Sequence, residues 1–335
     1  MAIRVAINGF GRIGRLVFRS IIEHGRKDLE VVAINDLGPV TTSAHLLKYD
    51  SSHGILDADI STDEDSMSVN GRSVRVFAER NPADLPWKEL GVDIVMECTG
   101  FFASKEKSLA HIEAGAKRVL ISAPAGGADK TIVYGVNHDS LSADDLVVSN
   151  ASCTTNCLAP VAKVLNDSFG MVRGYMTTIH AYTGDQPTLD TLHKDLYRAR
   201  SAGLSMIPTS TGAAKAVGLV LPELAGKLDG SSMRVPTPNV SCVDLCFDTS
   251  KNASIESVNA AIIAAADGPM NGVLGYSDLP LVSIDYNHNA NSSTFALPQT
   301  QVMDNRFVRI LSWYDNEWGF ATRMSDTAAA MGKFL

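Results

Sequence analysis

The segment Ile3–Gly14 reads IRVAINGFGRIG and joins an apolar run to a glycine-rich turn. Gly9, Gly11 and Gly14 have the spacing G-x-G-x-x-G, and the residues that follow have the apolar period of an amphipathic helix over residues 11–24. A strand, a glycine turn and a helix in this order are typical of a dinucleotide-binding βαβ unit. The segment therefore predicts that the chain begins with a nucleotide-binding fold.

Each part of this motif has a mechanical reason. Gly9 makes the tight turn, Gly11 lets the backbone approach a pyrophosphate, and Gly14 lets the helix pack closely on the strand. A second expected strand, Leu29–Ile34, leads to Asp36, which lies 22 residues after Gly14. A carboxylate there accepts hydrogen bonds from both ribose hydroxyls and repels a 2′-phosphate. The motif therefore favours NAD over NADP as cofactor.

Short aliphatic runs alternate with helical patterns through the first 150 residues. The runs lie at residues 3–7, 29–34, 92–97, 118–122 and 146–149, a further strand is expected at 73–77, and a second helix at 105–114. Nearly continuous apolar strands that alternate with helices indicate a parallel sheet covered on both faces. We therefore expect a Rossmann-type, doubly wound NAD-binding domain over residues 1–150.

The pattern of expected strands and helices changes after residue 150. We expect helices at 159–166, 255–266 and 318–333, and longer β-like runs at 174–182, 233–247 and 307–313. Pro160 must sit in a first turn or cause a kink, and Ser254 is a suitable N-cap. Residues 183–209 have no period, and a loop of this length inside a compact domain is usually functional. These elements predict a second domain over residues 151–315.

The boundary between the two domains coincides with a candidate nucleophile. Residues 149–157 read SNASCTTNC and place Cys153 at an expected helix entry, where free N–H groups and the helix dipole favour a thiolate. The alternative is a small apolar Cys that packs a turn. Cys157 lies one turn further along, where the helix uses its own donors, so packing is the more natural role there.

The residues alone do not decide the roles of His180 and of the arginines Arg198 and Arg234. His180 ends a strand-like run, and a lone His is more often structural than catalytic; beside Cys153 it would be a base. Arg234 precedes a stiff segment with two prolines, and its planar guanidinium suits a phosphate, whereas Arg198 competes with a role as a solvated surface residue. We place His24, His45 and His111 on exposed or half-buried faces.

Bulk composition excludes several classes of protein. A net charge of -8 and a pI near 5.5 argue against a broad nucleic-acid surface, and no apolar run approaches the length of a membrane span. Five cysteines cannot form a complete disulfide framework, and no second cysteine pair has zinc spacing, so we expect no metal site. With no signal-peptide layout, the expectation is a cytoplasmic protein without nucleic-acid or membrane partners.

Together, these and later segments resemble phosphorylating glyceraldehyde-3-phosphate dehydrogenases almost from end to end. The matching pieces are residues 6–15, 48–51, 97–100, 149–157, 178–183, 208–214, 234–237 and 312–317. The resemblance implies a second domain of α+β type with a mostly antiparallel sheet, a final helix (316–335) that packs back on the NAD-binding domain, and a homotetramer. It also implies oxidation of glyceraldehyde 3-phosphate with NAD and inorganic phosphate, through a thioester.

The resemblance assigns roles to individual positions. Cys153 matches the nucleophile and His180 the base. Positions that match cofactor contacts, with the glycines Gly9, Gly11 and Gly14, are Arg12, Ile13, Asp36, Arg80, Ser122 and Asn316. Positions that match the site of inorganic phosphate are Ser152, Thr154, Thr211 and Gly212, and those that match the site of the substrate phosphate are Thr183, Arg198 and Arg234.

The chain departs from the family pattern in the long loop. Leu192 stands where a proline is common in a region associated with cofactor choice, which leaves some use of NADP open, and Tyr197 replaces a common arginine. Two alternatives to the main interpretation remain. One is erythrose-4-phosphate dehydrogenase, whose substrate is one hydroxymethylene unit longer. The other is a secondary binding or redox-sensing role.

Overall fold

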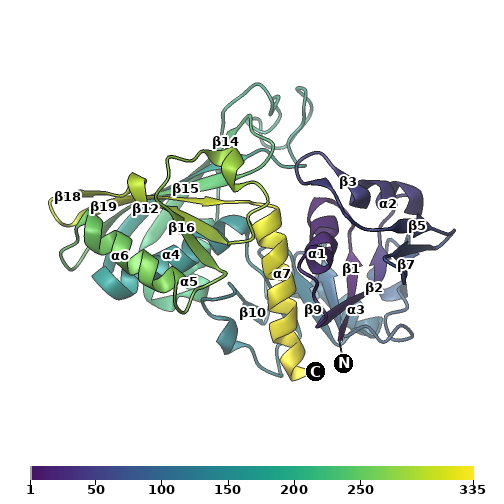
Figure 1. Cartoon of the computed structure of the whole chain (residues 1–335). Coiled ribbons are helices and arrows are strands. Elements are labelled where there is room, and N and C mark those ends of the chain that lie inside the picture. The colour runs from purple at the N-terminus through teal and green to yellow at the C-terminus, as the bar shows by residue number, and fades with distance from the viewer. Residues whose placement is uncertain (1) are drawn as a thin grey trace. The chain divides into compact units, whose positions relative to one another are not determined.

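The computed structural model describes residues 2–335, which form two compact units (Figure 1). Unit 1 contains the residues up to 132, residues 138–151 and residues 321–335, and unit 2 contains residues 133–137 and 152–320. The sequence placed the domain boundary at residue 150, and one of the points where the chain passes from unit 1 to unit 2 lies between Ala151 and Ser152.

Unit 1 is built on a nine-stranded sheet with the order β10-β11-β9-β8-β1-β2-β7-β6-β5. Every pair from β10 to β7 is parallel, and β7, β6 and β5 form an antiparallel extension. The strands are β1 Ile3–Asn8, β2 Leu29–Asn35, β5 Ile60–Thr62, β6 Ser66–Val69, β7 Arg72–Phe77, β8 Ile94–Glu97, β9 Arg118–Ile121, β10 Lys130–Thr131 and β11 Val147–Ser149. The core order β7-β2-β1-β8-β9-β11 is that of a Rossmann fold, so the predicted class is confirmed.

The remaining elements of unit 1 cover this sheet or extend from it. They are α1 Arg12–Glu23, α2 Val40–Lys48, α3 Lys105–Glu113 and the small sheet β3 Tyr49–Asp50 with β4 Gly54–Ile55. Helix α1 turns Leu16 and Val17 into the core, and Ser104 caps α3 by accepting a hydrogen bond from Lys107 N. The predicted helices at 11–24 and 105–114 are therefore present, each within one residue of the expected ends.

Two glycines of the first turn have no tolerable substitute. Gly9 has φ +88°, and a Cβ there would lie 2.7 Å from Thr99 N. A Cβ on Gly14 would lie 2.0 Å from the carbonyl oxygen of Gly9 and 3.0 Å from Cγ2 of Ile7 on β1. The close packing of helix on strand that the sequence predicted for Gly14 is thus present.

The C-terminal residues 321–335 pack within unit 1. They belong to helix α7, Trp318–Met331, and to the short turn after it. Ser325 Oγ lies 3.2 Å from Ser20 Oγ, Arg26 Nη1 donates to Asp326 at 2.5 Å, and Thr327 Oγ1 donates to Asn150 at 2.8 Å. These contacts attach the end of the chain to α1 and to the segment after β11.

Unit 2 contains an eight-stranded, mostly antiparallel sheet with the order β13-β14-β12-β15-β19-β17-β16, in which β18 pairs with β19. The strands are β12 Met171–Ala181, β13 Ile207–Ser210, β14 Leu228–Val235, β15 Ser241–Thr249, β16 Leu274–Ser277, β17 Ser293–Ala296, β18 Gln301–Met303 and β19 Phe307–Tyr314. Only β12 with β14 and β16 with β17 run parallel. The expected second sheet is confirmed, but the predicted single run at 233–247 is wrong, since Pro236 and Pro238 separate β14 from β15.

Three helices lie in unit 2: α4 Cys153–Phe169, α5 Ala213–Val220 and α6 Ile255–Ala266. Helix α6 has the predicted bounds and the predicted cap, with Ser254 and Ser257 forming a capping box. Helix α4 is longer than the predicted 159–166 and holds Pro160 in its interior rather than in its first turn. The extra turns at its start place Cys153 at the first helical position.

Candidate functional site

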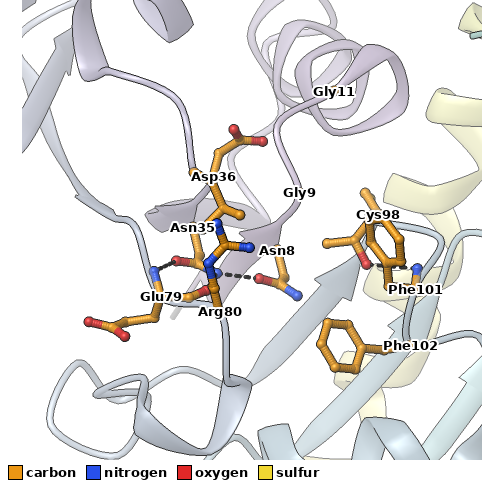
Figure 2. Close-up of a pocket in the computed structure, with 12 residues that line it drawn as sticks. Asn8, Gly9, Gly11, Asn35, Asp36, Glu79, Arg80, Cys98, Phe101 and Phe102 are labelled. Carbon is orange, nitrogen blue, oxygen red and sulfur yellow. Dashed lines mark hydrogen bonds between the residues drawn. The ribbon is translucent and has the colours of Figure 1, made fainter.

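A pocket of about 560 Å³ opens at the carboxyl ends of the parallel strands in unit 1 (Figure 2). Its lining residues come from the ends of β1, β2, β7 and β8 and from the segments that follow them; they are Asn8, Gly9, Gly11, Asn35, Asp36, Leu37, Glu79, Arg80, Cys98, Thr99, Phe101 and Phe102. This is where a doubly wound sheet binds its ligand. Phe101 and Leu37 are exposed apolar side chains that offer apolar contacts for a nucleotide base.

The pocket fits a dinucleotide at its two defining positions. Gly11 has open space around its missing Cβ, at the N-terminus of α1, so a phosphate can approach the backbone there. Asp36 follows β2, and its carboxylate accepts hydrogen bonds from Phe10 N at 2.7 Å and Gly38 N at 3.1 Å. These bonds fix the carboxylate at the mouth of the pocket.

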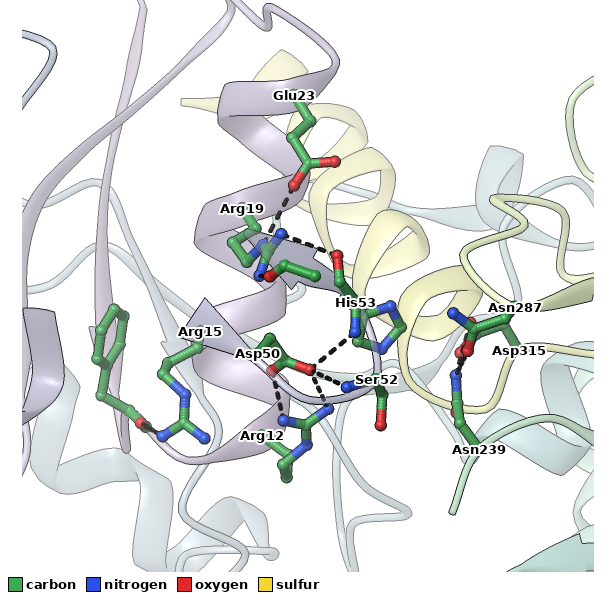
Figure 3. A network of polar contacts seen from close by, with 12 residues as sticks. Arg12, Arg15, Arg19, Glu23, Asp50, Ser52, His53, Asn239, Asn287 and Asp315 are labelled. Atoms are coloured by element: carbon green, nitrogen blue, oxygen red, sulfur yellow. Dashed lines mark hydrogen bonds and ion pairs between the residues drawn. The ribbon is translucent and has the colours of Figure 1, made fainter. Parts of the chain in front are cut away.

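The other predicted cofactor contacts are distributed more widely. Arg80 lines the pocket. Arg12 instead forms a bidentate ion pair with Asp50, with Nη1–Oδ2 and Nη2–Oδ1 distances of 2.5 and 3.2 Å (Figure 3). Ile13 and Gly14 belong to α1, and Ser122 N bonds to the strand end at Glu97 O. Asn316 is part of unit 2, where its Oδ1 accepts a hydrogen bond from Ser241.

Beneath the pocket lies a buried polar network that the sequence did not predict. Glu97 is fully buried and accepts hydrogen bonds from Thr99 N at 2.8 Å, Asn8 Nδ2 at 2.5 Å and the ring of His111 at 3.1 Å. Trp87 Nε1 donates to the other nitrogen of His111. The prediction that His111 is exposed or half-buried is therefore wrong, because long-range partners satisfy its polar atoms inside the core.

In unit 2, Cys153 begins α4 and faces His180 at the end of β12. Ser152 is the N-cap, with its Oγ accepting from Thr155 N at 3.1 Å, and Cys153 Sγ lies 3.6 Å from His180 Nε2. Just before the cap, Ala151 has φ 56°, a left-handed conformation that is unusual for a residue with a side chain. The structure thus brings the predicted nucleophile and base within contact.

Arg234 contacts the opposite side of the same imidazole. His180 and Arg234 are register partners on the parallel strands β12 and β14. Arg234 Nη1 lies 2.9 Å from His180 Nδ1, 2.9 Å from Ala181 O and 3.2 Å from Thr183 Oγ1. Tyr314 packs edge-on against the imidazole, with 5.9 Å between ring centroids.

The electrostatics of this pair differ from the thiolate that the sequence predicts at Cys153. Burial raises the pKa of the Cys153 thiol, against the charge of Arg234 and the N–H and hydroxyl of Thr154, which lower it. Burial and, next, the charge of Arg234 lower the pKa of His180 to about 3. The expected lowering of the thiol pKa is therefore not found in this structure, because desolvation outweighs the charge of Arg234 and the hydrogen bonds at the start of α4.

The three predicted contacts of the substrate phosphate lie in one chain of polar contacts. Arg234 donates to Thr183, Thr183 donates to Asp185, and Arg198 donates to Asp185 at 2.7 Å and to Thr209 at 3.0 and 3.1 Å. Asp185 was not among the site residues that the sequence predicted. Its position two residues after Thr183, in the irregular loop, was the available signal.

The four residues expected at the phosphate site lie at two adjoining helix starts. Ser152 caps α4, Thr211 accepts from Ala213 N at 3.1 Å, and Gly212 is the N-cap residue of α5. Thr155 Oγ1 lies 3.4 Å from Ala213 O, which connects the first turns of the two helices. Thr154 is buried, and its hydroxyl contacts Tyr314 at 2.8 Å, a partner that the sequence did not predict.

The remaining cysteines have structural surroundings. All five are free; burial raises the pKa of Cys157 and Cys242 to about 12, and Cys98 is shifted upward as well. Cys242 packs among apolar side chains, while Cys246, on the same face of β15, is partly exposed. Residues 2–335 contain no cluster of three or more His, Cys, Asp or Glu arranged to hold a metal. None of the helices among them is long and apolar enough to span a membrane.

Comparisons with known proteins agree with this geometry. Residues 3–105 match the family model described as glyceraldehyde 3-phosphate dehydrogenase, NAD binding domain, and residues 152–316 match the C-terminal domain of the same family. The chain is 68% identical over 333 residues to glyceraldehyde-3-phosphate dehydrogenase of Xanthobacter flavus, with 99% of each chain covered. It is 67% identical to that of Cereibacter sphaeroides, with all of both chains covered. The chain therefore belongs to the glyceraldehyde-3-phosphate dehydrogenase family.

Proposed function

We propose that this protein catalyses the NAD-dependent oxidative phosphorylation of D-glyceraldehyde 3-phosphate to 1,3-bisphosphoglycerate. The observation that carries the proposal is the Cys153 sulfur at a helix start, 3.6 Å from Nε2 of a buried histidine whose other nitrogen contacts an arginine. A thiol, a base and anion-binding groups together suit acyl transfer through a covalent intermediate. Family membership supports the substrate and the cofactor.

Cys153 and His180 divide the covalent chemistry between them. The Cys153 sulfur adds to the aldehyde carbon as the C=O π bond opens onto oxygen, and Nε2 of His180 takes the thiol proton, which gives the anion of a hemithioacetal on Cys153. NAD held in the pocket of unit 1 would supply the hydride acceptor that the conversion of this adduct to a thioester requires. The N–H groups at the start of α4 are placed to stabilise negative charge on the oxygen of the adduct.

Two groups of residues account for the two phosphates. Thr183, Arg198 and Arg234 bind the phosphate of the substrate, since guanidinium groups donate parallel hydrogen bonds to phosphate oxygens. Ser152, Thr154, Thr211 and Gly212 bind the inorganic phosphate that attacks the thioester, at the starts of the two helices α4 and α5. Gly9, Gly11, Arg12, Ile13, Gly14, Asp36, Arg80, Ser122 and Asn316 serve the cofactor.

The activity is tested by following NADH absorbance after glyceraldehyde 3-phosphate and phosphate are added to the protein with NAD. We expect turnover that depends on all three reactants. Specificity constants for glyceraldehyde 3-phosphate and erythrose 4-phosphate, measured side by side, then show whether the enzyme prefers the three-carbon or the four-carbon substrate. A preference for the tetrose would replace the proposed substrate, and absence of turnover with either would refute the reaction.

We further propose that the protein is a cytoplasmic homotetramer. The loop from Leu189 to Met206 exposes six large apolar side chains: Leu189, Leu192, Leu196, Tyr197, Leu204 and Met206. Apolar groups at this density on one loop favour burial against another copy of the chain. Light scattering should give four times the chain mass of 35.8 kDa; a monomer at micromolar concentration would contradict this proposal.

A further inference from the structure

Glu97 ends β8 beneath the cofactor pocket, and both of its carboxylate oxygens form hydrogen bonds inside the protein. Its Oε1 accepts hydrogen bonds from Thr99 N at 2.8 Å and from the Thr99 hydroxyl. Its Oε2 accepts one from Asn8 Nδ2 at 2.5 Å and lies 3.1 Å from Nε2 of His111. The carboxylate is therefore surrounded by groups of unit 1, and the role of the histidine among them decides what it can still do.

Trp87 fixes which nitrogen of His111 carries a proton. The indole Nε1 of Trp87 can only donate and lies 3.1 Å from His111 Nδ1, so Nδ1 is the acceptor. The ring then carries its proton on Nε2 and donates it to Glu97 Oε2. A carboxylate has about four acceptor positions, and these four neutral donors use them all. Glu97 thus has none left for a ligand, and it acts on the pocket through the residues that it holds.

Oxygen Oε1 of Glu97 holds the segment after β8. Thr99 donates to it twice, and the Thr99 hydroxyl in turn accepts a hydrogen bond from Phe101 N at 3.0 Å. The backbone of Thr99 lies against Gly9, where a Cβ would be 2.7 Å from Thr99 N. Gly9, Thr99 and Phe101 all line the pocket. This oxygen therefore keeps one wall of the pocket against the first glycine of the turn.

Oxygen Oε2 of Glu97 determines how two amides of the opposite wall are turned. Asn8 donates its Nδ2 to the carboxylate, so its Oδ1 is free to accept from Asn35 Nδ2 at 2.7 Å. The same Nδ2 donates to Glu79 O at 2.9 Å, and Asn35 Oδ1 accepts from Glu79 N at 2.8 Å (Figure 2). All three residues line the pocket, and Glu79 directly precedes Arg80. The direction of each bond follows from the one before it.

We propose that Glu97 is a positioning residue for the cofactor. Its carboxylate joins the ends of β1, β2 and β8 and the segment after β7, so the pocket has its binding shape before a dinucleotide enters. A site that is already ordered loses less conformational entropy when its ligand binds, and its affinity is higher. His111 supports Glu97 by supplying a donor, and Trp87 supports His111. This inference rests on the proposed function, which assigns the pocket to NAD.

The experiment measures the Kd of ADP-ribose and of NAD by titration calorimetry, with urea unfolding to show that each variant is folded. ADP-ribose has the adenosine and pyrophosphate groups of NAD and no nicotinamide. In Glu97→Gln the new NH2 group faces two donors in either orientation, one pair from Thr99 and the other from Asn8 and His111. We expect the Kd of both ligands to rise about tenfold. Glu113→Gln, an exposed carboxylate on the same helix as His111, should leave both Kd values unchanged.

Two variants of His111 test its role without changing Glu97. His111→Phe keeps an aromatic ring and removes both nitrogens, so the Kd of ADP-ribose should rise about fivefold. His111→Gln supplies one donor and one acceptor without charge, as the neutral imidazole does, and should bind within about twofold of the unaltered protein. In His111→Phe the KM for NAD should rise while kcat at saturating NAD stays near normal. A loss of folded protein would instead lower kcat and leave KM unchanged.

The outcomes separate this inference from the proposed reaction. An unchanged Kd of ADP-ribose in folded Glu97→Gln would overturn the positioning role, and so would equal affinities of the two His111 variants. If Glu97→Gln does not fold, the His111 variants decide. Absence of NADH formation by the unaltered protein, together with the expected rise in Kd, would refute the reaction and leave the positioning role intact. Failure of the unaltered protein to bind either ligand would overturn both.

Discussion

The cofactor pocket of unit 1 and the Cys153 site of unit 2 are specified by different kinds of information. The pocket is built around one local motif, with Gly9, Gly11 and Asp36 within a single βαβ segment. The Cys153 site collects side chains from α4, β12, β14, β19 and the loop after β12. A local motif determines its own geometry through backbone conformation. A site whose residues come from separate strands and helices depends on how those strands are paired. The two regions should therefore fail independently, and variants can separate them.

The largest effect should come from Cys153→Ser, which affects only the second region. A serine hydroxyl is a far weaker nucleophile, so we expect turnover to fall by about 10⁴-fold or more. The affinity for NAD, titrated by protein fluorescence, should change less than about twofold, because the pocket residues are untouched. Turnover within tenfold of the unaltered protein would remove Cys153 from the mechanism.

A glycine pair tests the first region. Gly14→Ala should destabilise the protein by about 3 kcal/mol or more, since its Cβ would lie 2.0 Å from Gly9 O in a well-packed turn. Gly11→Ala has open space and should keep its stability within about 1 kcal/mol while weakening NAD. Urea unfolding followed by circular dichroism measures both. Equal stability of the two variants would refute the packing argument for Gly14.

Much of unit 1 could be predicted from the sequence because its information is local. The glycine spacing, the apolar strands and the acid after β2 are patterns within about 30 residues, and the sheet order follows from general rules for such folds. His111 shows the limit. Its ring lies 3.4 Å from the side chain of Asn8, 103 residues earlier in the chain, so its burial depends on contacts that no local pattern contains.

Unit 2 was less predictable because its site depends on contacts between segments that lie far apart in the sequence. The cap at Ser254 and the position of Cys153 at a helix start are local features, and both were predicted. The pairing of His180 with Arg234 depends on the register of β12 with β14, across 54 residues, and Asp185 lies in a loop without a period. The sequence named Cys153 and His180 but could not show that burial opposes their ionisation, because desolvation depends on the folded surroundings.

A smaller effect is expected at Asp36, again in the first region. Asp36→Ala removes the proposed ribose acceptor and should weaken NAD about tenfold while reducing the preference over NADP. Asp36→Asn is the matched control: it keeps an oxygen for Phe10 N but loses the charge, so it should mainly affect the preference against NADP. Kd values for both cofactors decide the matter, and an unchanged preference in both variants would contradict the ribose role.

The smallest effect concerns the Arg12–Asp50 pair of unit 1. Hydrogen bonds and charge from Arg12, with N–H groups of Ser52 and His53, lower the pKa of Asp50 to about 2 despite the opposing effect of burial. A depressed carboxyl pKa stabilises the fold above the unfolded value of about 4, and that stabilisation is lost as pH falls toward 2. Asp50→Asn should cost about 1 kcal/mol at pH 7.

The difference in Tm between Asp50→Asn and the unaltered protein gives the check. It should be largest near pH 7 and shrink as pH falls from 5 toward 2. A difference that stays constant over this range would show that the charge of Asp50 does not contribute. NADH formation with Asp50→Asn, measured at saturating NAD and pH 7, should remain near normal, since the change lies outside the Cys153 site.

The covalent role of Cys153 is tested most directly by stopped-flow absorbance at 340 nm when the protein and NAD are mixed with glyceraldehyde 3-phosphate and phosphate is omitted. We predict a rapid burst of about one NADH per active chain, followed by near arrest, because the thioester on Cys153 has no phosphate to accept its acyl group. Adding phosphate should then restore steady turnover. Sustained turnover at the same rate without phosphate, or an undiminished burst in Cys153→Ser, would contradict the account.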